Sequence, residues 1–149
     1  MTPNFNDDLV QKLRDLTIEA GAAILEIYHT DFEIRSKADS SPVTEADEKA
    51  EAIILAGLTE LAPDIPAIGE EAYTAGVRPD ISGGVFWLVD ALDGTKEFIH
   101  KRGDFTVNIG LIIDGVPALG LIYAPAKDIL YRGIVCPENG ARSAIVERN

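Results

Sequence analysis

Two apolar runs joined by a tight turn constrain the fold of this chain more than any other feature. Residues 105–113 and 116–123 are rich in aliphatic and β-branched side chains, and Asp114-Gly115 lies between them. An Asp-Gly pair adopts the positive φ angles of a two-residue hairpin turn, so we predict that the two runs pair as antiparallel strands. Residues 129–135 form another apolar run. The later part of the chain is therefore predicted to be a mostly antiparallel sheet.

An amphipathic helix is predicted near the start of the chain. Between residues 7 and 28 the apolar side chains recur at steps of three and four, which is the period of a helix with one buried face. Asp7 or Asp8 is the predicted N-cap, because a short acidic side chain accepts a hydrogen bond from a free backbone N–H group. The polar stretch at 32–43 is predicted to be a loop or an irregular hairpin.

A second helix is predicted to start at Thr44. Thr44 and Asp47 are spaced almost as in a capping box, an apolar stripe follows them, and Pro63 ends the helix. Short strands are then predicted at 65–69 and 85–89, where apolar residues run into acidic ones.

The order of these elements indicates an α+β fold. Residues 72–84 contain several glycines and a proline and are predicted to be a loop. The apolar run at 143–146 is predicted to be too short to form an element that closes a core. Two N-terminal helices packed on a mostly antiparallel sheet are therefore expected, and 149 residues suffice for one domain with its own core.

Charge and composition exclude several classes of function. With 13 basic and 25 acidic residues, the net charge is −12, which repels nucleic-acid backbones and anionic membranes. The single cysteine, Cys136, excludes an internal disulfide and fits a reducing compartment. Residues 1–8 lack the features of a signal peptide, and no apolar run has the length of a membrane span. A cytoplasmic protein that acts on a small molecule is expected.

Three carboxylates follow the two short predicted strands. Glu70 comes directly after one strand, and Asp90 and Asp93 come after the other. Oxygen ligands of this kind suit Mg²⁺, which usually keeps some waters and shares oxygens with a substrate phosphate. Carboxylates gathered without cations would repel one another, so a preformed cluster predicts metal binding.

The residues after this acidic pair favour phosphate chemistry. Gly94 permits close backbone approach, and if Thr95 begins a short helix, the free N–H groups of both residues point towards an anion. The Thr95 hydroxyl could orient a water, with Asp47 accepting the proton of that hydroxyl. Each feature also has a plain structural explanation: an Asp-x-x-Asp-Gly turn, a solvated Glu70-Glu71 pair, a charge near a helix start at Asp47. The functional argument depends on their conjunction.

The three segments together resemble a known family. Pro-Val-Thr-Glu-Ala-Asp at 42–47, Gly-Glu-Glu at 69–71 and Trp-Leu-Val-Asp-Ala-Leu-Asp-Gly-Thr-Lys-Glu-Phe at 87–98 resemble the lithium-sensitive, magnesium-dependent phosphatases of the inositol monophosphatase family. The Lys-Glu-Phe at 96–98 is similar to its 3′(2′),5′-bisphosphate nucleotidase branch. The resemblance implies a substrate, adenosine 3′,5′-bisphosphate from sulfate assimilation, which is hydrolysed to AMP and phosphate.

The resemblance also implies roles for individual residues and two or three Mg²⁺ ions. Glu70 and Asp90 would hold the catalytic ion with the Leu92 carbonyl, Asp90 and Asp93 would share the second, and Glu70 with waters would hold a third. The remaining implied roles are water activation by Thr95 and Asp47, phosphate binding by the amides of Gly94 and Thr95, and contact of Lys37 with the outer waters.

Two departures from the family pattern affect these expectations. Ala91 stands where the family usually has proline. The resemblance covers only the first half of a usual member, an αβαβα-layered protein, so residues 1–149 are expected to be its N-terminal metal-binding portion. A later Trp-Asp segment of the family supplies a further aspartate to the second metal, whereas the one tryptophan here, Trp87, is followed by Leu88.

Two alternatives therefore stay open. One is an inositol monophosphatase or another sugar-phosphate phosphatase. The other is a non-catalytic module that binds a divalent ion or associates with a further copy of itself, because a shortened sheet would expose an open edge and an apolar face.

Overall fold

The structure is a computed structural model that describes residues 5–31, 41–136 and 139–148. Within these ranges the elements are, in chain order, α1 (Asp7–Tyr28), α2 (Ser41–Leu61), β1 (Ala67–Gly69), α3 (Glu70–Thr74), β2 (Val85–Asp93), α4 (Thr95–Ile99), β3 (Thr106–Ile113), β4 (Val116–Ala124), β5 (Ile129–Val135) and β6 (Arg142–Arg148).

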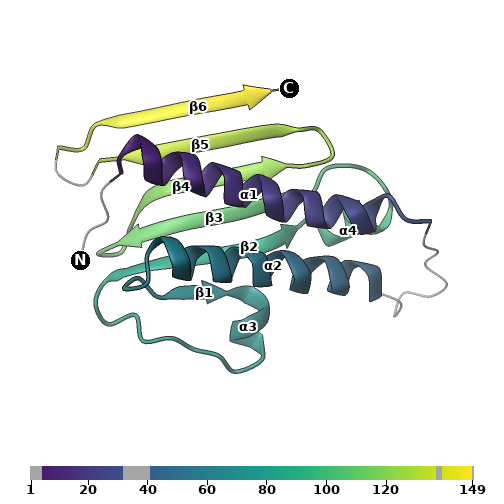
Figure 1. Cartoon of the computed structure of the whole chain (residues 1–149), viewed down its shortest axis with the longest axis horizontal. Helices are drawn as coiled ribbons and strands as arrows, with labels where there is room; N and C mark the ends of the chain where they lie inside the picture. Colours follow the sequence, from purple (N-terminus) through teal and green to yellow (C-terminus); the bar gives the residue numbers. More distant parts are fainter. Residues whose placement is uncertain (1–4, 32–40, 137–138, 149) are drawn as a thin grey trace.

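A single sheet organises the described residues. Its six strands follow one another in chain order from β1 to β6; β1 and β2 are parallel, and every later pair is antiparallel. The long helices α1 and α2 lie across one face of this sheet (Figure 1). The predicted α+β architecture is confirmed.

The core lies between the helices and the sheet. Helix α1 packs on β3 and β4, and α2 packs on β1 and β2. Side chains such as Leu13, Ile54, Trp87 and Leu121 are fully buried there. On the opposite face of the sheet Leu88 and Ile122 stay exposed, at 43% and 45%. The helices therefore cover one face of the sheet and leave an apolar surface on the other.

The predicted hairpin is present. Ile113 pairs with Val116, and Asp114 and Gly115 between them have φ angles of 50° and 79°. Two positive φ angles match the right-handed twist of the flanking strands, which explains the Asp-Gly sequence. No helix among the described residues is long and apolar enough to cross a membrane.

Both predicted helix caps were wrong. Asn6 caps α1, because its Oδ1 accepts a hydrogen bond from the Leu9 N–H at 2.8 Å, and Asp7 and Asp8 lie in the first turn. Helix α2 begins at Ser41 rather than at Thr44, which places part of the predicted 32–43 loop in the helix. Prolines fit a first turn, whose N–H groups have no intrahelical partner, and Pro42 lies there.

Four further expectations need correction. The loop predicted at 72–84 begins as helix α3, and strand β1 is shorter than predicted. Strand β2 does not end at Val89 but continues to Asp93. The run at 143–146 belongs to β6, which is held by pairing with β5 rather than by burial of its own side chains.

Candidate metal centre

The register of the parallel strands places two of the predicted ligands side by side. Gly69 of β1 pairs with Val89 of β2, so Glu70 and Asp90 follow at equivalent positions. Neighbouring strands lie about 4.8 Å apart. The carboxyl ends of parallel strands meet at the same edge of a sheet, and this edge therefore carries both acids.

A bulge in β2 sets the spacing of the two aspartates. Asp90 pairs with Asn108 and Asp93 with Thr106, so two residues of β2 oppose one residue of β3. Ala91 and Leu92 within the bulge are buried against the core, whereas Asp93 is exposed. The bulge thus fixes the backbone between the acids. The prediction that Asp93 follows the end of the strand was wrong, because both aspartates lie within β2.

Gly94 and Thr95 form a sharp junction after this strand. Gly94 has φ 94° and ψ 49°, and Thr95 begins α4, as predicted. A Cβ at residue 94 would lie 2.8 Å from the Asp104 carbonyl oxygen, so glycine is needed for both conformation and space. Phe98, one turn later, is fully buried, with its ring 5.3 Å from that of Phe105. This packing holds α4 in place and leaves Thr95 exposed.

Perturbed acidities show that the acids influence one another. Burial, followed by the neighbouring carboxylate of Glu70 and by Asp93, raises the pKa of Asp90 to about 6. Burial, followed by the adjoining carboxyl of Glu71 and then by Asp90 and Glu70, raises the pKa of Asp47 to about 8. Five acidic side chains from α2, α3 and β2 therefore share one region.

The donor set fits a divalent cation. The Oδ1 atoms of Asp47 and Asp90 are buried and accept no hydrogen bond among the described residues. Buried carboxylate oxygens without donors are costly, and a cation removes that cost. Mg²⁺ is commonly bound through one or two carboxylates together with waters and phosphate oxygens. We infer that Glu70 and Asp90 would provide such ligands.

The described residues do not form a closed metal cage. Within them, no three His, Cys, Asp or Glu side chains converge tightly enough to enclose an ion. The ligand roles of Glu70, Asp90, Asp93 and the Leu92 carbonyl thus stay predictions.

The roles predicted for the remaining residues also stay predictions. Asp47 is buried in α2 and Thr95 begins α4, and these two helices pack against each other. This contact brings together the elements of the proposed Thr–Asp pair. Lys37 lies outside the described residues.

Sequence reasoning missed two acids of this region. The Glu71 carboxyl adjoins that of Asp47 in the structure. The sequence did not single out Glu71, because a solvated surface pair explained Glu70-Glu71 equally well. Glu51 is buried on α2, and its carboxylate accepts hydrogen bonds from α3. The one available clue was its spacing: Glu51 follows Asp47 by four residues and so lies on the same helix face.

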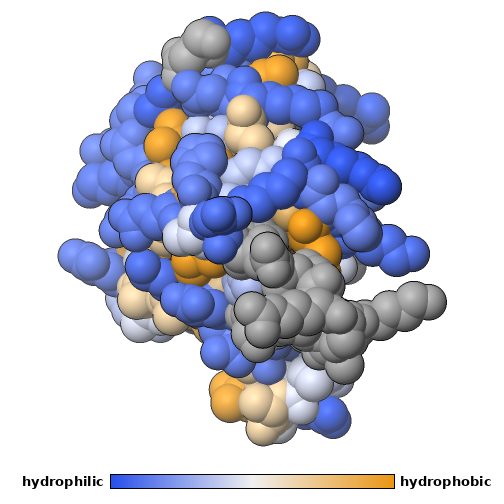
Figure 2. All heavy atoms as spheres, turned by 90° about the vertical axis from the view of Figure 1, so that its right-hand side faces the viewer, coloured by the Kyte–Doolittle hydropathy of each residue, from blue (hydrophilic) through white to orange (hydrophobic). Residues whose placement is uncertain are grey.

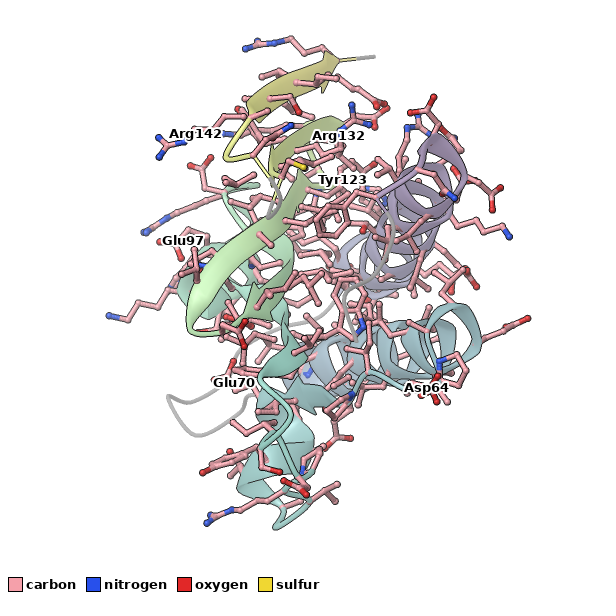
Figure 3. All side chains as sticks on the ribbon, turned by 90° about the vertical axis from the view of Figure 1, so that its left-hand side faces the viewer. Asp64, Glu70, Glu97, Tyr123, Arg132 and Arg142 are labelled. Carbon is pink, nitrogen blue, oxygen red and sulfur yellow. The ribbon has the colours of Figure 1, made fainter. Side chains whose placement is uncertain are left out.

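The surroundings of the acids are polar at one end of the molecule and apolar along the sheet. Described residues at the end that carries α4 are mostly hydrophilic (Figure 2). Arg132 and Arg142 lie on the far strands of the sheet, well away from Glu70 (Figure 3). A groove of about 1010 Å³ runs over the open sheet face; Glu70, Asp90 and Asn108 line it, together with apolar residues such as Leu88.

Comparison with known proteins identifies the family. The model of the inositol monophosphatase family matches residues 6–142. The chain belongs to this family. Its members depend on a divalent metal, generally Mg²⁺. Family membership confirms the family resemblance that the three segments indicate.

Individual relatives indicate which branch of the family this chain is similar to. The chain is 46% identical over 125 residues to the 3′(2′),5′-bisphosphate nucleotidase CysQ of Shigella flexneri, which covers 83% of this chain and 50% of that protein. The Escherichia coli K12 CysQ is 44% identical over the same length and coverage.

Solved structures of the family share the fold. The crystal structure of CysQ from Bacteroides thetaiotaomicron matches with a TM-score of 0.72 and 36% identity over 97% of this chain and 51% of that one. Inositol monophosphatase-II from Staphylococcus aureus matches with a TM-score of 0.74 and 29% identity over 93% and 50%. The chain spans about half the length of the relatives that it matches.

Proposed function

We propose that the chain is the metal-binding portion of a Mg²⁺-dependent phosphomonoesterase that hydrolyses adenosine 3′,5′-bisphosphate to AMP and phosphate. The observation that carries this proposal is the in-register placement of Glu70 and Asp90 at one sheet edge, where the Asp90 Oδ1 has no hydrogen-bond donor among the described residues. The substrate class rests on the identity to CysQ nucleotidases.

Metal ions would be held by the acids of β2 and α3. Glu70, Asp90, Asp93 and the Leu92 carbonyl are the proposed ligands of two or three ions. When bound, Mg²⁺ neutralises phosphate charge and makes a bound water more acidic. The acids alone would repel an anionic substrate. Substrate binding therefore depends on bound cations, which make the local charge of the site positive.

The junction at Gly94 would hold the phosphate and the attacking water. The backbone N–H groups of Gly94 and Thr95 are proposed to donate to phosphate oxygens, and the Thr95 hydroxyl to orient the water. Asp47 is proposed to accept the proton that Thr95 passes on, because it is buried on α2, and α2 packs against α4, where Thr95 lies.

The test combines metal binding with phosphate release. We expect the chain to bind Mg²⁺ in calorimetry and to release phosphate from adenosine 3′,5′-bisphosphate only when Mg²⁺ is present. Asp90→Asn should abolish both. Asp64→Asn is the matched control, because Asp64 is an exposed aspartate away from the acids and its loss should change neither measurement.

Other outcomes would support the alternatives. Faster turnover of inositol 1-phosphate than of the bisphosphate would favour an inositol monophosphatase, an alternative supported by the Staphylococcus aureus structure. Mg²⁺ binding without hydrolysis would favour a non-catalytic metal-binding module, and a size measurement would then show whether the chain self-associates. A chain that binds no Mg²⁺ contradicts the proposal.

A further inference from the structure

Glu51 is a buried carboxylate that connects α2 to the start of α3. Its side chain is only 5% exposed. One carboxylate oxygen accepts the N–H of Glu71 at 2.8 Å, and the other accepts the N–H of Ala72 at 2.9 Å. Both oxygens are therefore used within the protein, and hydrogen bonds to an ionised acceptor are among the stronger ones.

Gly69 makes room for this carboxylate. A Cβ at residue 69 would lie 2.5 Å from the Glu51 Cδ and 2.6 Å from its Oε1. The φ angle of Gly69 is −97°, which any residue adopts. Space for Glu51, rather than backbone conformation, therefore explains the glycine.

These contacts hold the backbone on both sides of Glu70. Gly69 precedes it and packs against the Glu51 carboxylate, and Glu71 follows it and donates to that carboxylate. Rotation of the backbone at Glu70 would consequently break a partly buried hydrogen bond to the Glu51 carboxylate. Glu51 itself points to backbone N–H groups and is not a candidate ligand.

We propose that Glu51 is a positioning residue that aims the Glu70 carboxylate at the metal site beside Asp90. The proposal rests on the metal role proposed above for Glu70. Residues that orient a metal ligand typically change metal affinity 10- to 100-fold when they are replaced. Glu51 lies on α2, whereas Glu70, whose carboxylate it orients, begins α3.

Mg²⁺ affinity of the folded chain tests this role. We expect Glu51→Gln to weaken Mg²⁺ binding about 10- to 100-fold in calorimetry, because an amide can accept only one of the two N–H groups. Glu60→Gln is the control: it removes the same charge from an exposed position of α2 and should leave the affinity unchanged. Circular dichroism would establish that each variant is folded at the temperature of the titration.

A second variant perturbs the same contact without altering any charge. Gly69→Ala should push the Glu51 carboxylate away from its two donors and weaken Mg²⁺ binding as well. Glu51→Gln and Gly69→Ala break the same contact, so their effects on Mg²⁺ affinity should not add. The double variant should bind Mg²⁺ as tightly as whichever single variant has the lower affinity.

The outcomes separate this role from simple stabilisation and from the proposed function. If Glu51→Gln folds and is less heat-stable but binds Mg²⁺ as tightly as the unmodified chain, Glu51 has no positioning role. The proposed metal site would then remain intact. An unmodified chain that binds no Mg²⁺ would overturn both proposals.

Discussion

Gly94→Ala should destabilise the chain more than an ordinary glycine substitution. Gly94 has a φ of 94°, and an L-residue in the left-handed region costs about 1–2 kcal/mol. The added Cβ would lie 2.8 Å from the Asp104 carbonyl oxygen and 3.1 Å from the Phe105 Cα. These are backbone atoms of a segment that leads into β3, so relief requires a shift of the backbone, and overpacking of this kind costs about 1–3 kcal/mol. The expected loss of unfolding free energy is about 2–5 kcal/mol.

Urea unfolding followed by circular dichroism measures this loss, and Gly76→Ala provides the matched control. Gly76 has a φ of 99°, and a Cβ there would meet nothing within 4 Å. The control should therefore lose only the conformational cost, about 1–2 kcal/mol. Equal losses for the two variants would refute the argument that the close approach of Asp104 and Phe105 requires glycine at the junction before Thr95.

Three further predictions concern the scaffold around the site. Asn6→Ala should lower the unfolding free energy by about 1 kcal/mol, because the Leu9 N–H loses its cap; an unchanged urea midpoint would contradict this. Phe98→Ala should cost about 3–5 kcal/mol in the same assay, since its ring is fully buried; a loss below about 1 kcal/mol would show that α4 is not anchored there. Burial and the hydrogen bond to Asp128 raise the pKa of Tyr123 from 10.0 to about 12, so the folded state binds this proton more tightly than the unfolded state. Stability should fall as the pH rises from 10 to 12, and Tyr123→Phe should show a smaller fall when urea unfolding is compared across that range.

Local patterns in the sequence were sufficient for several elements. The helix over 7–28 follows from the spacing of its apolar residues, and the hairpin follows from Asp114-Gly115. The short helix that begins at Thr95 follows a glycine with positive φ. Each of these features depends on residues that are close along the chain. The family and the candidate acids were likewise evident from three short segments.

Other features depended on contacts that no local pattern contains. Strand β6 has mostly exposed side chains and is held by backbone pairing with β5, so hydrophobic alternation could not reveal it. The continuation of β2 to Asp93 depends on its bulged pairing with β3. The cap of α1 also depended on geometry, because Asn6, Asp7 and Asp8 are adjacent polar residues and only Asn6 accepts the Leu9 N–H group.

The sequence by itself determined which acids this chain carries, and the tertiary structure decided how they act together. The register of β1 against β2 sets Glu70 beside Asp90, and the packing of α2 over these strands buries Asp47 and Glu51. The Glu51 carboxylate meets an N–H group twenty residues further along the chain. Burial, a missing hydrogen-bond donor and a raised pKa all arise from such distant neighbours, and for that physical reason they became visible only in the folded molecule.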